Sequence, residues 1–183
     1  MQKVYANLDG DLGKLIQNRI NTKKYFTIGE IKAILGSVAI GLDEMHRNKI
    51  IHRDLKPQNI FVCDDTFKIG DLGLAGIIKT DEMFRSQKGT PAYMAPEIIN
   101  QVKYSYPVDI WSLGCIAYEL YELAIPFNSP VLIQLLSDIT NSKYPPLSNR
   151  YSADLRSLIQ CMLLKDPSKR PTSKQVIEMI SNI

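Results

Sequence analysis

The sequence predicts a mainly α-helical protein with about six helices and one small β-hairpin. Apolar residues recur at helical spacing in several long stretches, and only residues 60–69 hold two short apolar runs on either side of turn residues. The 183 residues are 45% hydrophobic and 22% charged, which is ordinary for a globular protein with a core. We find no internal repeat of about 20 to 50 residues, so a solenoid is not indicated.

The N-terminal third predicts two helices. The first is expected to open at "GDLG", Gly10–Gly13, with Asp11 in its first turn, where a carboxylate interacts favourably with the helix dipole. A longer helix is expected within Tyr25–Lys49, with Thr27 and Glu30 as a capping box. Its apolar residues follow the spacing of one buried stripe: Ile31, Ile34, Leu35, Val38, Leu42 and Met45.

A hairpin is predicted next. The apolar runs Ile60–Cys63 and Phe67–Ile69 flank the turn residues "DDT", which is typical of two paired strands. The polar stretch "KTDEMFRSQKGT" that follows is long for a structureless loop, and such loops are usually functional or disordered.

The C-terminal half predicts four further helices. Val108–Leu123 is apolar on most sides, so this helix is expected in the middle of the domain. Three more helical patterns cover Val131–Thr140, Ala153–Leu164 and Ser173–Ile180, and Thr172 is a candidate cap for the last of them.

Charge and cysteine usage exclude several classes of protein. The net charge of +3 is too small to indicate a nucleic-acid or membrane-surface partner. The N-terminus lacks the apolar segment of a signal peptide, and no stretch approaches the roughly 18 apolar residues of a membrane-spanning helix. Cys63, Cys115 and Cys161 are far apart and form no metal-binding or disulfide pattern. A cytoplasmic or nuclear location is therefore expected.

Polar groups that the hairpin does not need for its own stability stand at both of its ends. "HRDLKPQN", His52–Asn59, precedes it, and the second "GDLG", Gly70–Gly73, follows it. Because a hairpin folds back on itself, Asn59 and Asp71 are expected side by side, with Asp54 on the loop leading in. Carboxylate and amide oxygens suit Mg²⁺, and a carboxylate that does not bind the metal can accept a proton.

At this point the sequence closely resembles the eukaryotic protein kinases. "HRDLKPQN" is similar to their catalytic loop, and "DLG" at Asp71–Gly73 looks like D-F-G with Leu72 in place of Phe. "APE" at Ala95–Glu97, "DIWSLG" at Asp109–Gly114 and "KDPSKRP" at Lys165–Pro171 resemble three later motifs, in the family's order and over almost the whole chain. The stretches "QNIF", "KIGDLGLA" and "GTPAYMAPE" look like the NIMA-related group, although an aromatic residue is more usual than Ala92.

The resemblance implies a serine/threonine kinase that uses ATP and Mg²⁺. Asp54 would accept the proton of the substrate hydroxyl, and Asn59 and Asp71 would hold Mg²⁺ against the ATP phosphates. Lys56 would reach the γ-phosphate, and its position two residues after the aspartate marks a Ser/Thr rather than a Tyr kinase. Phe61 would form the floor under the adenine.

The resemblance also implies an activation segment at residues 71–97. Ser86 is the expected phosphorylation switch, with Thr80 as the second candidate, and Arg53 would receive the phosphate. Thr90 would brace the catalytic loop. Leu74, large and unbranched at Cβ, implies a preference for serine over threonine in the protein substrate.

Four residues are implied in structural roles. His52 would pack against Leu72, and Asp109 would hold the backbone of the catalytic loop. Glu97 and Arg170 would form a buried ion pair.

The family's Gly-rich loop, G-x-G-x-x-G-x-V, and its V-A-I-K lysine do not occur in the 183 residues. Residues 1–11 look like the hinge and 12–183 like the large lobe, so a partial kinase domain without the N-terminal β-lobe is expected. Three hypotheses stay open. In the first, the chain is a piece of a complete kinase. In the second it is a pseudokinase, which binds a substrate, another kinase or a regulatory protein, and in the third it is an enzyme that another chain completes.

Overall fold

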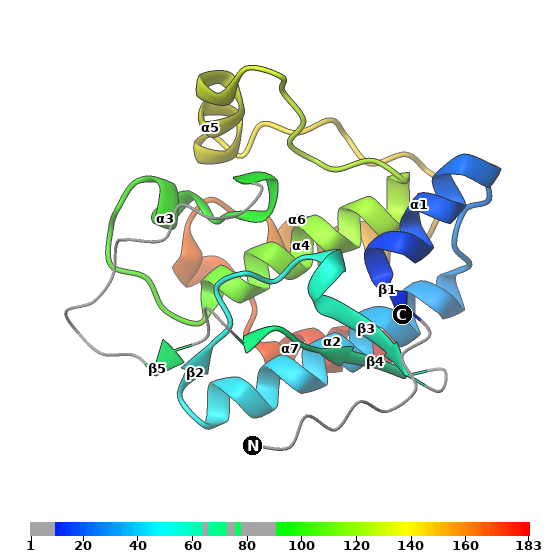
Figure 1. Cartoon of the computed structure of the whole chain (residues 1–183), viewed down its shortest axis with the longest axis horizontal. Coiled ribbons are helices and arrows are strands. Elements are labelled where there is room, and N and C mark those ends of the chain that lie inside the picture. Colours follow the sequence, from blue (N-terminus) through cyan, green and yellow to red (C-terminus); the bar gives the residue numbers. More distant parts are fainter. Residues whose placement is uncertain (1–9, 64–65, 73–75, 78–90) are drawn as a thin grey trace.

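The computed structural model describes residues 10–63, 66–72, 76–77 and 91–183. Within these residues the chain forms seven α-helices and two small antiparallel sheets (Figure 1). The helices are α1 (Leu12–Thr22), α2 (Ile28–Arg47), α3 (Pro96–Ile99), α4 (Pro107–Glu122), α5 (Leu132–Thr140), α6 (Ala153–Met162) and α7 (Ser173–Asn182). None of these described helices combines the length and the apolar character that a membrane crossing requires.

The predicted mainly α-helical class is confirmed, and the predicted hairpin is present. Strands β3 (Ile60–Cys63) and β4 (Thr66–Ile69) pair antiparallel, with Ile60 opposite Ile69. The other strands are short: β1 (Gly10–Asp11) extends the hairpin on the β3 side, and β2 (Ile50–Ile51) pairs with β5 (Gly76–Ile77).

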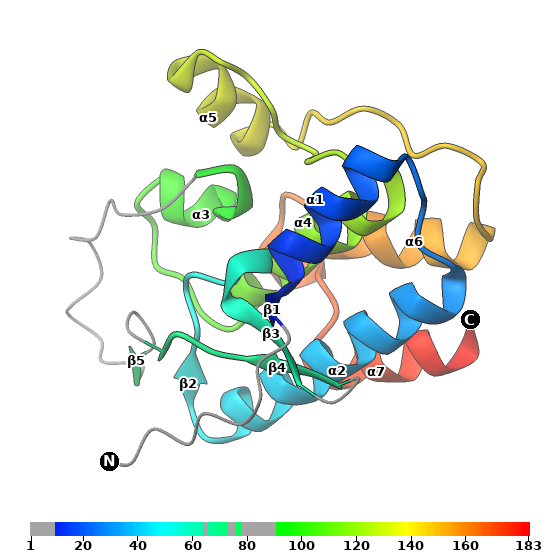
Figure 2. The same ribbon diagram turned by 45° about the vertical axis from the view of Figure 1, so that its right-hand side comes forward.

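Helix α4 runs through the middle of the molecule. The two views show α1, α2 and α6 around it, α2 and α7 side by side, and α5 next to α3 (Figures 1 and 2). Thirteen of the sixteen residues of α4 are buried. Core side chains surround this helix on all sides, which explains why its sequence shows little amphipathicity.

The long second helix carries the predicted cap and the predicted stripe, except that Met45 is only half-buried and lies outside the core cluster of the described residues. Ile31, Ile34, Leu35, Val38 and Leu42 are buried, and the helix packs against α4 and α7. The Thr27 hydroxyl accepts a hydrogen bond from Glu30 N, while the Glu30 carboxylate accepts one from Thr27 N. This capping box starts the helix by satisfying two backbone N–H groups that would otherwise lack partners.

The expected position of Asp11 is wrong by one place. Asp11 is the N-cap of α1 and accepts a hydrogen bond from Lys14 N at 2.9 Å, so it lies just outside the first turn. Its own backbone is extended because it belongs to β1, opposite Phe61 of β3. A strand of two residues has no apolar alternation, so the sequence gives no signal for it.

Candidate active site

Three of the predicted site residues meet on the loop before the hairpin. Lys56 Nζ lies 2.8 Å from Asp54 Oδ2. The Asn59 amide nitrogen donates to the Asp54 carbonyl oxygen at 2.8 Å and to Asp54 Oδ2 at 3.1 Å. One carboxylate oxygen of Asp54 therefore receives hydrogen bonds from both a cation and an amide, which fixes its orientation.

The local sequence explains this fold of the loop. Lys56 is extended, and Pro57 opens the short 3-10 turn η1 (Pro57–Asn59), where a missing N–H costs nothing. Asn59 N donates to the Lys56 carbonyl at 2.9 Å and closes the turn. Asn59 thus lies directly before β3, with its side chain turned back toward Asp54.

The hairpin brings the chain after β4 back to Asn59. Gly70 N donates to the Asn59 carbonyl at 2.8 Å, one step beyond the Ile60–Ile69 pair. Asp71 follows immediately, with φ of 52° in the left-handed region and an exposed side chain. The positions of Asn59 at the entrance and Asp71 at the exit follow from this register.

The side chains of these two residues offer the kind of oxygen atoms that a magnesium ion would take as ligands. The Asn59 nitrogen is used on Asp54, so its oxygen is the ligand atom that remains, and Asp71 adds a carboxylate. No cluster of three or more His, Cys, Asp or Glu residues lies in the described part of the chain. A donor set with so few protein oxygens suits Mg²⁺, which usually keeps waters and phosphate oxygens as its other ligands.

The side chain of Asp109, on α4, holds the backbone of the loop His52–Asn59, which carries Asp54. Its fully buried carboxylate accepts from His52 N and from Arg53 N, each at 3.0 Å. His46, in the last turn of α2, adds a contact of 2.9 Å from Nε2 to Asp109 Oδ2. No local sequence pattern indicates this contact, because the two residues are 63 positions apart.

His52 acts through hydrogen bonds. Its Nε2 lies 3.0 Å from the Gly70 carbonyl, and its Nδ1 accepts from Asp54 N at 3.3 Å. A proton on Nε2 satisfies both contacts. His52 is fully buried and Leu72 is 56% exposed, and the expected packing between them stays a prediction.

Glu97 and Arg170 form the expected buried ion pair. Two Arg170 nitrogens donate to the two Glu97 oxygens at 2.7 and 2.8 Å. The remaining N–H groups donate to the carbonyls of Leu164, Lys165 and Pro107. The guanidinium also lies over the Trp111 ring, 4.9 Å from its centroid. The pair joins α3 to the turn η4 (Pro167–Lys169) and to the start of α4.

Arg53 has φ of 69°, and its Nε is buried without a hydrogen-bond partner in the described part of the chain. A buried guanidinium N–H with no partner is costly, so this atom is suited to an anionic group brought by another segment. The expected phosphorylation sites Ser86 and Thr80, together with Thr90 and Leu74, lie outside the described residues.

A second polar contact links the turn η3 (Pro91–Tyr93) to α4. The Tyr93 hydroxyl donates to Glu119 Oε2 at 2.6 Å, and Ser112 Oγ donates to the Tyr93 carbonyl at 2.8 Å. Burial raises the pKa of Tyr93, and the nearby Glu119 carboxylate raises that pKa further. Burial also raises the pKa of Glu119, although the hydrogen bond from Tyr93 opposes this. No sequence motif marks Tyr93 and Glu119 as a pair, since only the fold brings the two residues together.

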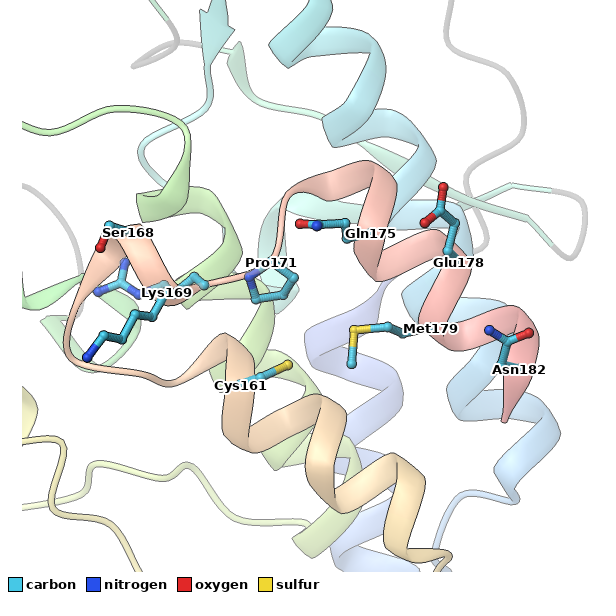
Figure 3. A pocket seen from close by; sticks show the side chains of 9 residues that line it. Cys161, Ser168, Lys169, Pro171, Gln175, Glu178, Met179 and Asn182 are labelled. Carbon is cyan, nitrogen blue, oxygen red and sulfur yellow. The ribbon is translucent and has the colours of Figure 1, made fainter.

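A shallow pocket of about 540 Å³ lies elsewhere, between α6, η4 and α7 (Figure 3). Cys161 and Met179 reach into it, while Lys169, Glu178 and Asn182 stand around its rim. Its exposed charged groups, Lys169 and Glu178, are of opposite sign. The residues that converge on the catalytic loop are not part of it.

The comparisons with known proteins agree with this geometry. The family model of the protein kinase domain matches residues 4–180. The chain is 40% identical, over 96% of its length, to the probable serine/threonine-protein kinase nek3 of Dictyostelium discoideum. It is 38% identical over 92% of its length to the serine/threonine-protein kinase Nek1 of Mus musculus. The chain spans only 16% and 14% of these two relatives.

A fungal protein kinase is also similar to the chain over most of its length. The chain is 34% identical, over 93% of its length, to the G2-specific protein kinase nim-1 of Neurospora crassa, and it spans 23% of that protein.

Proposed function

The chain belongs to the protein kinase family, among the NIMA-related serine/threonine kinases, and we propose that it carries the catalytic part of such a kinase. The reaction is transfer of the γ-phosphoryl group of Mg-ATP to a serine or threonine of a protein. The observation that supports this most strongly is the contact of Asp54 with both Lys56 and Asn59, one turn before the hairpin that leads to Asp71.

Asp54 is the proton acceptor of the proposed reaction. Its carboxylate takes the hydroxyl proton of the substrate while the hydroxyl oxygen bonds to the γ-phosphorus and the bond to the leaving ADP breaks. Lys56 reaches the γ-phosphate from beside Asp54. Asn59 and Asp71 would hold Mg²⁺, which supplies charge neutralisation to the phosphates when bound.

The remaining assignments follow from the same family. Phe61, half-buried on β3, underlies the adenine. Phosphorylation of Ser86 switches the activation segment on, and Arg53, with its unpartnered Nε, receives that phosphate. Thr90 braces the catalytic loop, and Leu74 favours serine in the substrate. Residues 12–183 correspond to the large lobe of the kinase domain, and residues 1–9 of the expected hinge, residues 1–11, lie outside the described residues.

A second candidate function is a protein-interaction module. Val131, Leu132 and Ile133, at the start of α5, are 58%, 59% and 80% exposed. Neighbouring apolar side chains that remain exposed are typical of surfaces that bind other proteins. On this reading the chain binds a protein substrate, another kinase or a regulatory protein, and phosphoryl transfer is lost.

Nucleotide binding separates the two candidates. We expect the full chain to bind ATP in a Mg²⁺-dependent manner in isothermal titration. Asp71→Asn removes the carboxylate ligand and is expected to weaken the Mg²⁺-dependent part of binding by tenfold or more, roughly 1.4 kcal/mol. Asp138→Asn on α5 is the matched control, since it makes the same change far from the catalytic loop. No binding by the wild-type chain would favour the interaction module.

A further inference from the structure

The hairpin that carries the candidate site has two unlike faces. Ile60 and Ile69 belong to or pack against the core, and Ile69 lies against α2. Side chains alternate along a strand, so Phe61 and its partner Lys68 are on the other face. Phe61 is half-buried and lies outside the core cluster of the described residues.

Gly70 is on the same face as Phe61, diagonally across the hairpin. It continues the register by one residue beyond Ile69, because its N–H donates to the Asn59 carbonyl. A diagonal neighbour of this kind is within reach of an aromatic ring.

The backbone of Gly70 is held on both sides. Its N–H donates to the Asn59 carbonyl at 2.8 Å, and its own carbonyl lies 3.0 Å from His52 Nε2. His52 is in turn held by Asp109 through its backbone N–H. Among the glycines in the described ranges, only Gly10 has a positive φ, so the conformation of Gly70 is open to any residue.

The ring of Phe61 fills the space where a side chain at position 70 would begin. A Cβ on Gly70 would lie 2.3 Å from Phe61 Cε2 and 2.6 Å from Cδ2, well inside the 3.0 Å that real Cβ atoms respect. Since the backbone is held by two hydrogen bonds, the ring would have to move. Phe61 therefore lies over the glycine backbone because residue 70 has no side chain.

We propose that Gly70 is a specificity-determining residue of the nucleotide site: it leaves open the space in which the Phe61 ring lies. A planar base can then meet the aromatic ring without a side chain at position 70 in between. This inference rests on the proposed function, in which Phe61 underlies the adenine. Any larger residue at position 70 displaces the ring and changes the shape of the base-binding surface.

A double-mutant cycle in the full chain tests the pair. Gly70→Ala, Phe61→Leu and the double variant are compared by thermal unfolding and by titration with Mg-ADP. Gly70→Ala is expected to lower Tm and to weaken Mg-ADP binding about tenfold, the size of effect that loss of one aromatic stacking contact produces. In the Phe61→Leu background the same change is expected to have little effect, because the smaller side chain leaves room for the new methyl group.

Gly36→Ala is the matched control. It is the same substitution in the middle of α2, where a new Cβ meets no atom within 4 Å. It is expected to leave Mg-ADP binding unchanged and not to lower Tm.

The Tm cycle tests the inference about Gly70, and the Mg-ADP titration tests the proposed function, so failure of one can be told from failure of the other. If Gly70→Ala lowers Tm equally in both backgrounds, or leaves Tm unchanged, Gly70 does not set the position of the ring and the inference is overturned. If no variant, including the wild type, binds Mg-ADP, the proposed function fails for this chain. The Tm cycle would then still decide whether residues 61 and 70 act as one unit.

Discussion

Arg170 has the five N–H groups of a guanidinium, and the structure gives five hydrogen bonds to them. Three go to backbone carbonyls and two to Glu97, whose side chain is 5% exposed. A buried charge is tolerated only when its hydrogen-bonding capacity is used in this way. Glu97 is therefore important chiefly because its removal would leave the charge of Arg170 buried without a counter-charge.

Glu97→Gln is expected to lower the free energy of unfolding by about 3–5 kcal/mol, because it leaves the Arg170 charge buried without a counter-charge. Chemical denaturation of the full chain measures this. Lys169→Ala is the control, because the Lys169–Asp166 pair is exposed, with 3.8 Å between Nζ and Oδ2. A loss for Glu97→Gln no greater than that for Lys169→Ala would contradict the assignment.

At this scale the sequence predicts residues better than contacts. The motifs single out Asp54, Lys56 and Asn59, and the loop that joins them is short enough for the contacts to follow. His46 and Glu119 carry no such signal, since their partners, Asp109 of α4 and Tyr93 of η3, are brought near only by the fold. The packing of His52 against Leu72 stays a prediction, and the contact of the ring with the Gly70 carbonyl is one that the motif does not indicate.

At the scale of elements, length decides what the sequence can predict. The helices with a sustained apolar period were expected within two or three residues of their observed ends, and the caps at Thr27 and Thr172 form as predicted. Three strands, β1, β2 and β5, have two residues each, and α3 has four. These are too short to show a period, and they form because tertiary partners satisfy their backbone groups.

The crossing of α4 and α6 depends on Gly114. A Cβ at this position would lie 2.9 Å from Met162 Cβ and 3.0 Å from Leu163 Cδ2, and the first of these atoms belongs to a stiff part of the neighbouring chain. Gly114 therefore sets how closely the two helices approach.

Gly114→Ala is expected to destabilise the protein by about 1–3 kcal/mol, because overpacking forces the two helices apart. Gly36→Ala, in an open position of α2, should instead stabilise it by up to about 1 kcal/mol. Urea unfolding of both variants provides the measurement. If Gly114→Ala instead raised the stability as Gly36→Ala does, the two helices would have space for the added methyl group and the assignment of Gly114 would be contradicted.

At the scale of the whole molecule, α4 connects the parts of the candidate site. Asp109 near its start holds the catalytic loop, Ser112 and Glu119 hold the turn η3, and Gly114 lets α6 approach. Since these contacts come from one buried helix, the loop that carries Asp54 and the turn η3 share one rigid support (Figure 2).

The central claim is that this chain carries the catalytic residues of a NIMA-related kinase. Its 183 residues lack the family's Gly-rich loop and V-A-I-K lysine, so the claim is best tested where those parts are supplied. Residues 10–183 would replace the matching segment of a complete NIMA-related kinase, and phosphoryl transfer from labelled ATP to a serine peptide would be measured.

We predict that this chimaera is active. We also predict that Asp54→Asn within it lowers kcat by about 100-fold or more, the usual contribution of a positioned general base. Asp138→Asn should leave kcat unchanged, and both variants should unfold near the wild-type Tm. A folded chimaera without activity, or an Asp54→Asn variant that keeps kcat within a few-fold of the wild type, would contradict the account.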